Sequence, residues 1–217
     1  MAWSPEIADP RRRLALSYAR RADRAKLAML WALDERLGAI VGAAREPMLG
    51  EIRLAWWRDA LSALGTGAPG GEPLLGGLAM IVRDGGIEGG QLADLADGWT
   101  ALLAPLPLDA EALDRFATER GSRLFMLSAM LLGVGDHTGI EDAGAAWALA
   151  DLASHVSDRE TAIRSRALLQ DRLSAMPSRW PAPLRPLAML VAFARHEASA
   201  PGMVLIRGIW AGLTGRC

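Results

Sequence analysis

The spacing of apolar residues constrains the fold of this chain most strongly, because it follows a helical period almost throughout. Ala, Leu, Met, Arg and Glu, which favour helices, are abundant, while β-branched residues are sparse. Clusters of Gly and Pro interrupt the pattern and mark the connections between helices. We therefore predict an all-α protein, a single-domain helical bundle over residues 1–217. The predicted helices cover about 4–22, 24–43, 47–64, 73–84, 88–103, 109–133, 139–157, 158–175, 183–197 and 203–213.

Two of these segments, 24–43 and 139–157, are apolar over most of their circumference. A helix that is apolar all round lies inside a bundle, whereas an amphipathic helix lies at its surface. We therefore expect these two helices at the centre, with the others around them and a cavity between them.

Charge and composition exclude several classes of protein. The formal net charge is −1, so there is no basic excess to follow a nucleic-acid backbone, and we expect no nucleic-acid partner. The single cysteine, Cys217, cannot form an intrachain disulfide. The start of the chain lacks the pattern of a secretory signal, and the longest charge-free apolar run, 124–135, is shorter than the roughly 18 residues that a spanning helix needs. We expect a cytoplasmic protein without a transmembrane segment, with peripheral membrane contact left open.

The most distinctive stretch is the predicted helix that holds Arg53 and the Trp56–Trp57 pair. Arg53 and Trp57 are four residues apart, so they share a helix face and can stack. Two adjacent tryptophans cannot both face the centre of the core. This helix is either a half-buried packing helix or the carrier of a ligand-facing Arg/Trp pair.

Two motifs, WALDERL at 31–37 and EPMLGEIRLAWWRDAL at 46–61, resemble the squalene/phytoene synthase family. The likeness is nearest to a divergent branch of that family that includes a mitochondrial complex I assembly factor. It covers most of the chain and continues in order through Pro73-Leu74-Leu75, Asp97-Gly98-Trp99, Arg120-Gly121, Leu131-Leu132-Gly133 and Ala146-Trp147-Ala148-Leu149.

The resemblance implies an all-α bundle of the isoprenoid synthase type around a deep apolar cavity. Active members join two prenyl diphosphates head to head, and carboxylates of two Asp-rich motifs hold the Mg²⁺ ions that assist departure of diphosphate. Here the first motif aligns with Gly38, Ala39 and Gly42, whose side chains cannot bind a metal. The nearest acids, Asp34 and Glu35, lie about one turn earlier, or roughly 5.4 Å along the axis.

The second motif aligns with residues 155–159, where His155 and Arg159 stand in place of its two acids. One turn before it, Asp151 stands in place of an Asn, and Ala148 in place of a Gln. In a third segment of the family, Asp97 and Gly98 are kept, but Leu102 replaces the later acid.

One polar cluster remains near the second motif. Asp151, His155 and Asp158 have the spacing i, i+4, i+7 and would project from one face of a single helix. The cluster has three readings: a transition-metal site, a hydrogen-bonded triad at the mouth of the cavity with the pKa of His155 raised, or a polar stripe at a helix end.

The last predicted helix is apolar, contains Trp210 and carries Arg207. It either packs against the bundle or lies at a membrane or partner interface. Of these two roles, packing against the bundle is the expected one.

Three functions follow as hypotheses. The first is a non-catalytic member of the family, a binding or respiratory-complex assembly protein that has a protein partner and has lost the Mg²⁺ acids. The second is an isoprenoid transferase with relocated acids, and only this one needs Mg²⁺ as a cofactor. The third is a carrier of an isoprenoid or other lipid. The candidate catalytic residues are Asp34, Glu35, Asp151 and Asp158, the candidate ligand-binding residues are Arg53, Trp57, Asp97 and His155, and the candidate metal ligands are Asp151, His155 and Asp158.

Overall fold

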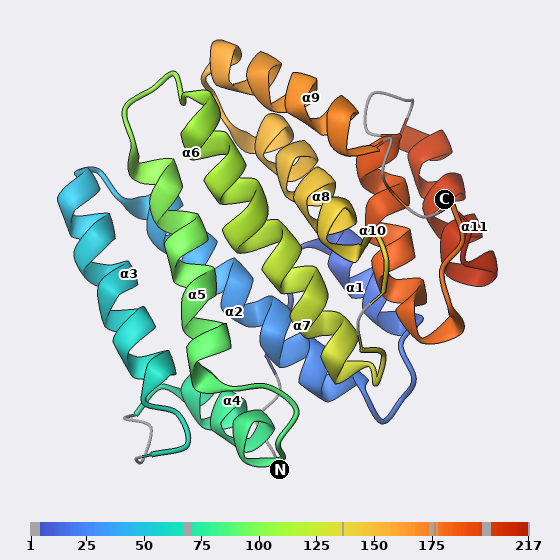
Figure 1. Cartoon of the computed structure of the whole chain (residues 1–217), viewed down its shortest axis with the longest axis horizontal. Coiled ribbons are helices and arrows are strands. Elements are labelled where there is room, and N and C mark those ends of the chain that lie inside the picture. Colours follow the sequence, from blue (N-terminus) through green and yellow to red (C-terminus); the bar gives the residue numbers. More distant parts are fainter. Residues whose placement is uncertain are drawn as a thin grey trace.

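The computed structural model describes residues 5–66, 71–135, 137–173, 176, 178–196 and 201–216, and these residues are almost entirely helical (Figure 1). The helices are α1 (Pro10–Ser17), α2 (Arg24–Ala43), α3 (Pro47–Ser62), α4 (Pro73–Arg83), α5 (Gly89–Thr100), α6 (Ala110–Arg115), α7 (Arg123–Leu131), α8 (Ile140–His155), α9 (Arg159–Leu173), α10 (Arg185–Arg195) and α11 (Pro201–Thr214). Short 3₁₀ turns, η1 (Ala101–Leu103) and η3 (Ala182–Leu184), follow α5 and precede α10, and a π-helical segment, η2 (Phe116–Ser122), joins α6 to α7.

The all-α prediction is confirmed, and most helix ends lie close to their predicted positions. Pro47 and Pro73 begin α3 and α4, as expected of a residue whose missing N–H costs nothing in the first turn. The prediction for the first helix is wrong. It begins only at Pro10, because Asp9 is extended and its side chain caps the N–H of Arg11. The predicted ends at residues 4, 175 and 197 lie outside the described residues.

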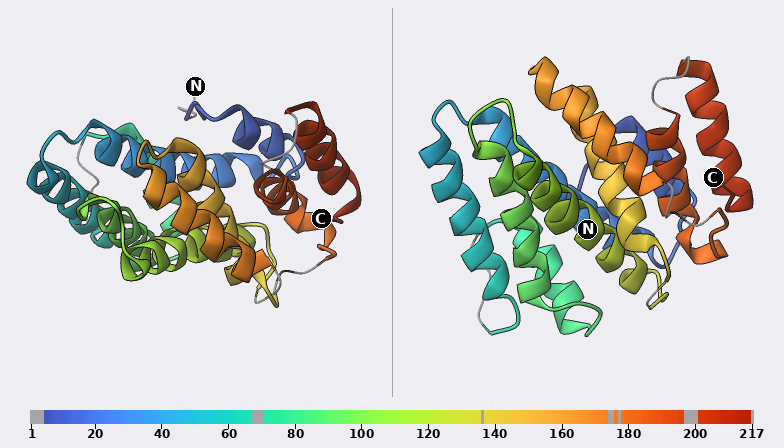
Figure 2. Two further views of the ribbon diagram at one scale, coloured as in Figure 1. Left: turned by 90° about the horizontal axis from the view of Figure 1, so that it is seen from above. Right: turned by 45° about the horizontal axis from the view of Figure 1, so that its top comes forward.

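The helices form a row across the molecule, in the order α3, α5, η2, α8, α10 and α11, with α9 packed on α8 (Figure 1). Helix α2 lies behind this row and contacts α3, α4, α5 and α7. Both views in Figure 2 keep α3 at one end of the molecule and α11 at the other. The long run α6–η2–α7 therefore passes through the middle of the bundle.

The expected central position is confirmed for α8, of which only a few residues are not buried. For α2 it holds for the first part, Leu27 to Leu37, while the last turns are more exposed. Among the described residues, no helix is long and apolar enough to cross a membrane.

Candidate functional site

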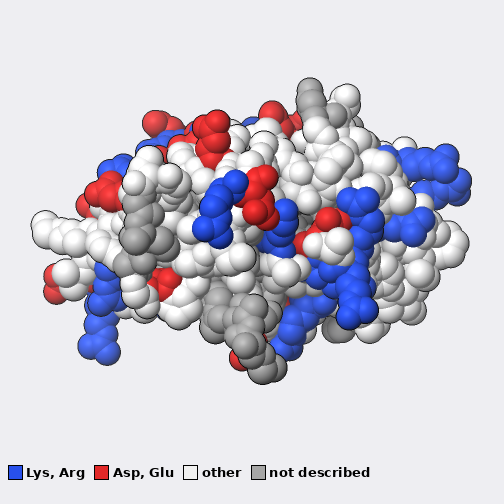
Figure 3. Space-filling view, turned by 90° about the horizontal axis from the view of Figure 1, so that it is seen from below, with Lys and Arg blue, Asp and Glu red and all other residues white. Residues whose placement is uncertain are grey.

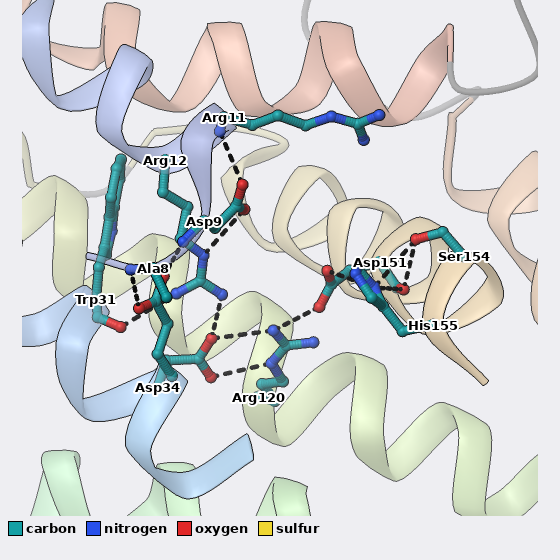
Figure 4. A network of polar contacts seen from close by, with 11 residues as sticks. Ala8, Asp9, Arg11, Arg12, Trp31, Asp34, Arg120, Asp151, Ser154 and His155 are labelled. Atoms are coloured by element: carbon teal, nitrogen blue, oxygen red, sulfur yellow. Dashed lines mark hydrogen bonds and ion pairs between the residues drawn. The ribbon is translucent and has the colours of Figure 1, made fainter. Parts of the chain in front are cut away.

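The centre of the bundle contains a fully buried carboxylate, Asp34 of α2, surrounded by four hydrogen-bond donors. Figure 4 shows the donors of Arg12 and Arg120. Arg120 donates from Nε to Oδ1 at 2.9 Å and from Nη2 to Oδ2 at 3.0 Å. Arg12 donates from Nη2 to Oδ2 at 2.5 Å, and Trp99 from Nε1 to Oδ1 at 2.8 Å. Burial opposes ionisation of Asp34, but Arg120 and Arg12 outweigh it and hold the pKa of this carboxyl below its ordinary value.

The network continues from Arg120 to Asp151 of α8. Nη2 of Arg120 lies 2.7 Å from Oδ2 of Asp151, so one nitrogen is shared between two carboxylates. Burial opposes the charge on both residues, but their mutual attraction raises the pKa of Arg120 and lowers the pKa of Asp151. With Arg12 and Asp34, the network contains two guanidinium and two carboxylate groups and is electrically neutral.

His155 ends the network at the surface, at the last residue of α8. Its Nδ1 lies 2.7 Å from the carbonyl oxygen of Asp151 and 3.4 Å from Oδ1 of the same residue. The hydrogen bond to the Asp151 side chain is the largest cause that raises the pKa of His155 to about 9. The imidazole is therefore protonated at neutral pH and adds one positive charge beside the buried network.

Aromatic rings enclose the guanidinium group of Arg120. It lies 4.2 Å from the ring centroid of Trp99, 4.6 Å from that of Trp147 and 5.0 Å from that of Phe116. Its Nη1 is buried and has no hydrogen-bond partner among the described residues, so the aromatic faces are its immediate surroundings. Polar and aromatic side chains together fill the middle of the bundle.

Close backbone contacts fix the position of Arg120 in the π-helical segment. A Cβ atom on Gly98 of α5 would lie 2.5 Å from the backbone nitrogen of Arg120. A Cβ atom on Gly121 or on Gly144 of α8 would overlap the carbonyl oxygen of the other glycine. Only glycine fits at these contacts, which allow α5 and α8 to approach η2 from either side. Single-turn π segments of this kind occur often at functional sites.

A pocket of about 380 Å³ lies beside the network, between α1, α8 and α10. Its volume is at the lower end of the range of small-molecule sites. Its wall combines apolar and polar side chains, including Trp147, Leu190, Phe193, Asp9, Asp151 and His155.

A sequence profile of the squalene/phytoene synthase family matches residues 8–176, a segment that contains the whole network and most of the bundle. The chain belongs to the squalene/phytoene synthase family. Neither the search of curated proteins nor the search of solved structures gave a match.

Within this squalene/phytoene synthase fold, Asp34 and Asp151 are the two candidate acids that come together, through Arg120. Glu35, the residue after Asp34, does not join this network. It accepts the backbone N–H groups of Ala8, at 2.8 Å, and Asp9, at 3.2 Å. It therefore holds the chain that leads into α1 and does not face Asp151.

The prediction that Asp151, His155 and Asp158 share one helix is wrong. Helix α8 ends at His155, because Val156 is extended, and Asp158 lies beyond it. Asp158 accepts the backbone N–H of Thr161 at 2.7 Å and so caps the start of α9. Among the described residues, no three His, Cys, Asp or Glu side chains lie close enough together to hold a metal ion.

The expected stacking of Arg53 on Trp57 is not found in α3. Arg53 is exposed, whereas Trp57 is buried and packs edge-on against Trp56 at a centroid distance of 5.4 Å. The expectation that two adjacent tryptophans cannot both be central is confirmed, since Trp56 is exposed. Asp97 of α5 is half-exposed, and its Oδ1 lies 3.6 Å from Nη1 of Arg58. Helix α3 lies on the far side of α5 from the pocket.

Sequence reasoning did not select Arg12, Arg120, Trp99 or Trp147 as site residues. Arg12 is the middle residue of three consecutive arginines, and it is buried whereas Arg11 and Arg13 are exposed. Trp99, Arg120 and Trp147 belong to the short motifs that carry the family resemblance, and this was the available signal. Trp99 and Arg120 bond Asp34 from positions 65 and 86 residues away in the sequence, and Trp147 packs against Arg120.

Proposed function

We propose that this chain is a non-catalytic member of its family that works by binding, either of an isoprenoid or other lipid or of a protein partner. One observation carries the proposal: Arg120 forms ion pairs with both acids that meet at the centre of the bundle, Asp34 and Asp151. In a transferase, central acids must be free to hold metal ions that bind diphosphate. Here they are neutralised by the chain itself.

The donor set is a poor fit for Mg²⁺. Mg²⁺ requires nearly octahedral oxygen ligands at about 2.0–2.1 Å and retains several waters. Each carboxylate oxygen of Asp34 already accepts two hydrogen bonds, and the group is fully buried. A cation placed there would also face the guanidinium groups of Arg12 and Arg120. We therefore derive no catalytic step through a metal ion.

The region aligned with the first Asp-rich motif supports the same proposal. A Cβ atom on Gly38 would lie 2.6 Å from Cη2 of Trp99, so the indole ring occupies the space that an acidic side chain would need. The ring also donates to Asp34. The indole ring of Trp99 and the absence of a side chain at Gly38 thus fit each other, and the ring fills the space of a carboxylate at this position.

The alternative of a transferase with relocated acids needs four carboxylates around one cavity. Glu35 holds backbone N–H groups near α1, and Asp158 caps α9. This leaves Asp34 and Asp151, both of which are paired with arginine. The geometry favours the non-catalytic proposal.

The pocket beside His155 favours a carrier or binding role. A ligand with an anionic head and an apolar body would meet the protonated imidazole of His155 and the apolar side chains of Trp147, Leu190 and Phe193 in the same pocket. An isoprenoid phosphate has this chemistry. Assembly of a respiratory complex is the form of protein binding that the likeness to the divergent branch implies, and the ligand would then regulate or stabilise the partner-binding form.

The test is calorimetric titration of the full chain with farnesyl diphosphate, with and without Mg²⁺, followed by an assay for released diphosphate. We expect binding that does not depend on Mg²⁺ and no release. His155→Ala should weaken binding, whereas His196→Ala, which removes an imidazole outside the pocket, should not. Mg²⁺-dependent binding with diphosphate release would overturn the non-catalytic proposal. Absence of binding under both conditions would exclude the isoprenoid ligand and leave the protein partner.

A further inference from the structure

Helix α11 carries an apolar surface that the bundle leaves uncovered. Its inner face consists of small residues: Gly208 packs against Phe193 of α10, and Gly212 packs against Met189 and Tyr18. Its outer face presents large apolar side chains to solvent, namely Met203, Leu205, Ile206, Trp210 and Leu213. Four of them, at 203, 206, 210 and 213, follow the helical spacing and form one stripe. Contiguous apolar surface of this kind marks an interaction site.

The charge around this stripe has one sign. Helices α1, α10 and α11 together contain six arginines and no acidic residue, although the whole chain has a net charge of −1. Arg12 is buried and paired with Asp34, which leaves five that are at least partly exposed, namely Arg11, Arg13, Arg185, Arg195 and Arg207. The positive charge is therefore concentrated at the end of the molecule that these helices form. Figure 3 shows basic side chains gathered toward that end, with few acidic ones among them.

Helices α1, α10 and α11 contribute to one surface at this end of the molecule. Arg11 of α1 lies 5.8 Å from the ring of Phe193, and the same ring packs against α11. Burial, Arg207 and Arg195 all lower the pKa of His196, so two arginines lie near the junction of α10 and α11. Figure 2 shows α1, α10 and α11 side by side. Arg207 itself is exposed and lies at the edge of the apolar stripe, one helical turn after Met203.

We propose that the exposed face of α11, with the arginines of α1 and α10 beside it, docks this protein on the surface of a membrane that contains anionic lipids. The helix has 14 residues, or about 21 Å, and would lie in the plane of the interface. Its apolar side chains enter the boundary of the acyl chains, Trp210 takes the interfacial level, and Arg207 extends to the lipid phosphates.

Helix α3, at the opposite end of the molecule, provides the comparison that favours a membrane as occupant. It also exposes apolar side chains, at Met48, Leu49, Ile52 and Trp56. Around them, however, Glu51 and Asp59 alternate with Arg53 and Arg58, so its surface has no single sign. Of these two faces, only the one at the α11 end has a charge that complements an anionic bilayer.

The experiment is co-sedimentation of the full chain with vesicles of phosphatidylcholine, with and without phosphatidylglycerol. We expect binding to the anionic vesicles that weakens as salt is raised. The double variant Ile206→Ser/Trp210→Ser should lower the partition coefficient by roughly ten-fold or more, because it removes two large apolar side chains. Arg207→Glu should lower it by more than the roughly five-fold that corresponds to about 1 kcal/mol for one arginine near the surface.

A matched variant on α3 separates docking from a general loss of apolar surface. Ile52 and Trp56 are 59% and 54% exposed, and Ile206 and Trp210 are 60% and 56% exposed. Ile52→Ser/Trp56→Ser should therefore keep full vesicle binding, and both double variants should keep the circular dichroism spectrum of the parent. The proposal is overturned by an equal loss in the two double variants, by equal binding to neutral vesicles, or by no binding to anionic vesicles. A dimer that only the α11 variant dissociates, without vesicle binding, would reassign this face to self-association.

Discussion

Arg120 binds Asp34 through two parallel contacts, with Nε 2.9 Å from one carboxylate oxygen and Nη2 3.0 Å from the other. Both side chains are excluded from solvent. A bidentate arginine–carboxylate pair is both strong and geometrically specific. The pair joins α2 to the π-helical segment, two elements that lie far apart in the sequence.

Asp34→Asn should destabilise the fold strongly. The change keeps the shape of the side chain but removes the buried counter-charge of both arginines. Arg120 then keeps only Asp151, and Arg12 keeps only Asp9 at 3.8 Å, and both of these acids are partly exposed. Removing one partner of a buried pair costs about 3–5 kcal/mol. We expect a loss of this size in the free energy of unfolding, measured by urea denaturation.

Glu35→Gln, at the next residue of the same helix, is the control for Asp34→Asn. The amide oxygen can still accept a backbone N–H near α1, and the site is only partly buried. The expected loss is about 1 kcal/mol or less. If the two variants lost the same stability, the central network would not be the main electrostatic contribution to the fold.

Gly38→Ala should be destabilising, although alanine favours helices more than glycine does. The new methyl group would lie 2.6 Å from Cη2 of Trp99, whose ring is held by its bond to Asp34. Overpacking of this kind costs about 1–3 kcal/mol. Thermal denaturation should show a lower midpoint for this variant.

Gly42→Ala tests the same exchange one turn later in α2, where no atom lies within 4 Å of the new methyl group. Here the helix propensity of alanine should leave the stability unchanged or raise it by up to about 1 kcal/mol. Opposite signs for the two variants are the expected result. A neutral Gly38→Ala would mean that Trp99 moves freely and does not fill this space.

The helix boundaries could be predicted because their signals are local. Pro47 and Pro73 begin their helices, and Gly139, with a positive φ of 81°, precedes α8. The prediction of the first helix is wrong over residues 5–9, which are not helical and precede Pro10, the residue that begins α1. The residues at the start of a helix, such as Pro at its first position, therefore predict where it begins better than apolar spacing does.

The central network could not be predicted, because no local pattern produces it. Arg12 and Arg120 reach Asp34 from positions 22 and 86 residues away. Whether an arginine in a polar run is buried depends on which helices pack around it. The π-helical segment that holds Arg120 also packs closely on α8 where Gly121 meets Gly144, and this contact too joins residues far apart in the sequence.

Gly144→Ala should disturb this contact directly. The added methyl group would overlap the backbone carbonyl of Gly121, and a backbone atom cannot move aside as a side chain can. We expect the free energy of unfolding to fall by about 1–3 kcal/mol or more, and Arg120 to be positioned less firmly. Gly76→Ala in α4, where nothing lies within 4 Å, should have no comparable effect. Urea denaturation of the two variants measures the difference.

The pH dependence of stability should carry a contribution from His155. Its pKa in the folded protein, about 9, is higher than its ordinary value of 6.5, so the folded state binds the proton more tightly. The stabilisation is therefore complete below pH 6.5 and is lost as the pH rises toward 9. Because the side chain is 77% exposed, solvent screening should limit the contribution to less than about 1 kcal/mol.

Nuclear magnetic resonance titration of the histidine ring protons separates this effect from others. The midpoint of His155 should lie above 6.5, because Asp151 and, more weakly, Asp9 favour its charged form. That of His196 should lie below 6.5, because burial, Arg207 and Arg195 oppose its charge. His155→Gln should remove the decline in unfolding free energy between pH 6.5 and 9. A titration of His155 at its ordinary pKa would contradict the contact with Asp151, since this contact is the main cause of the shift.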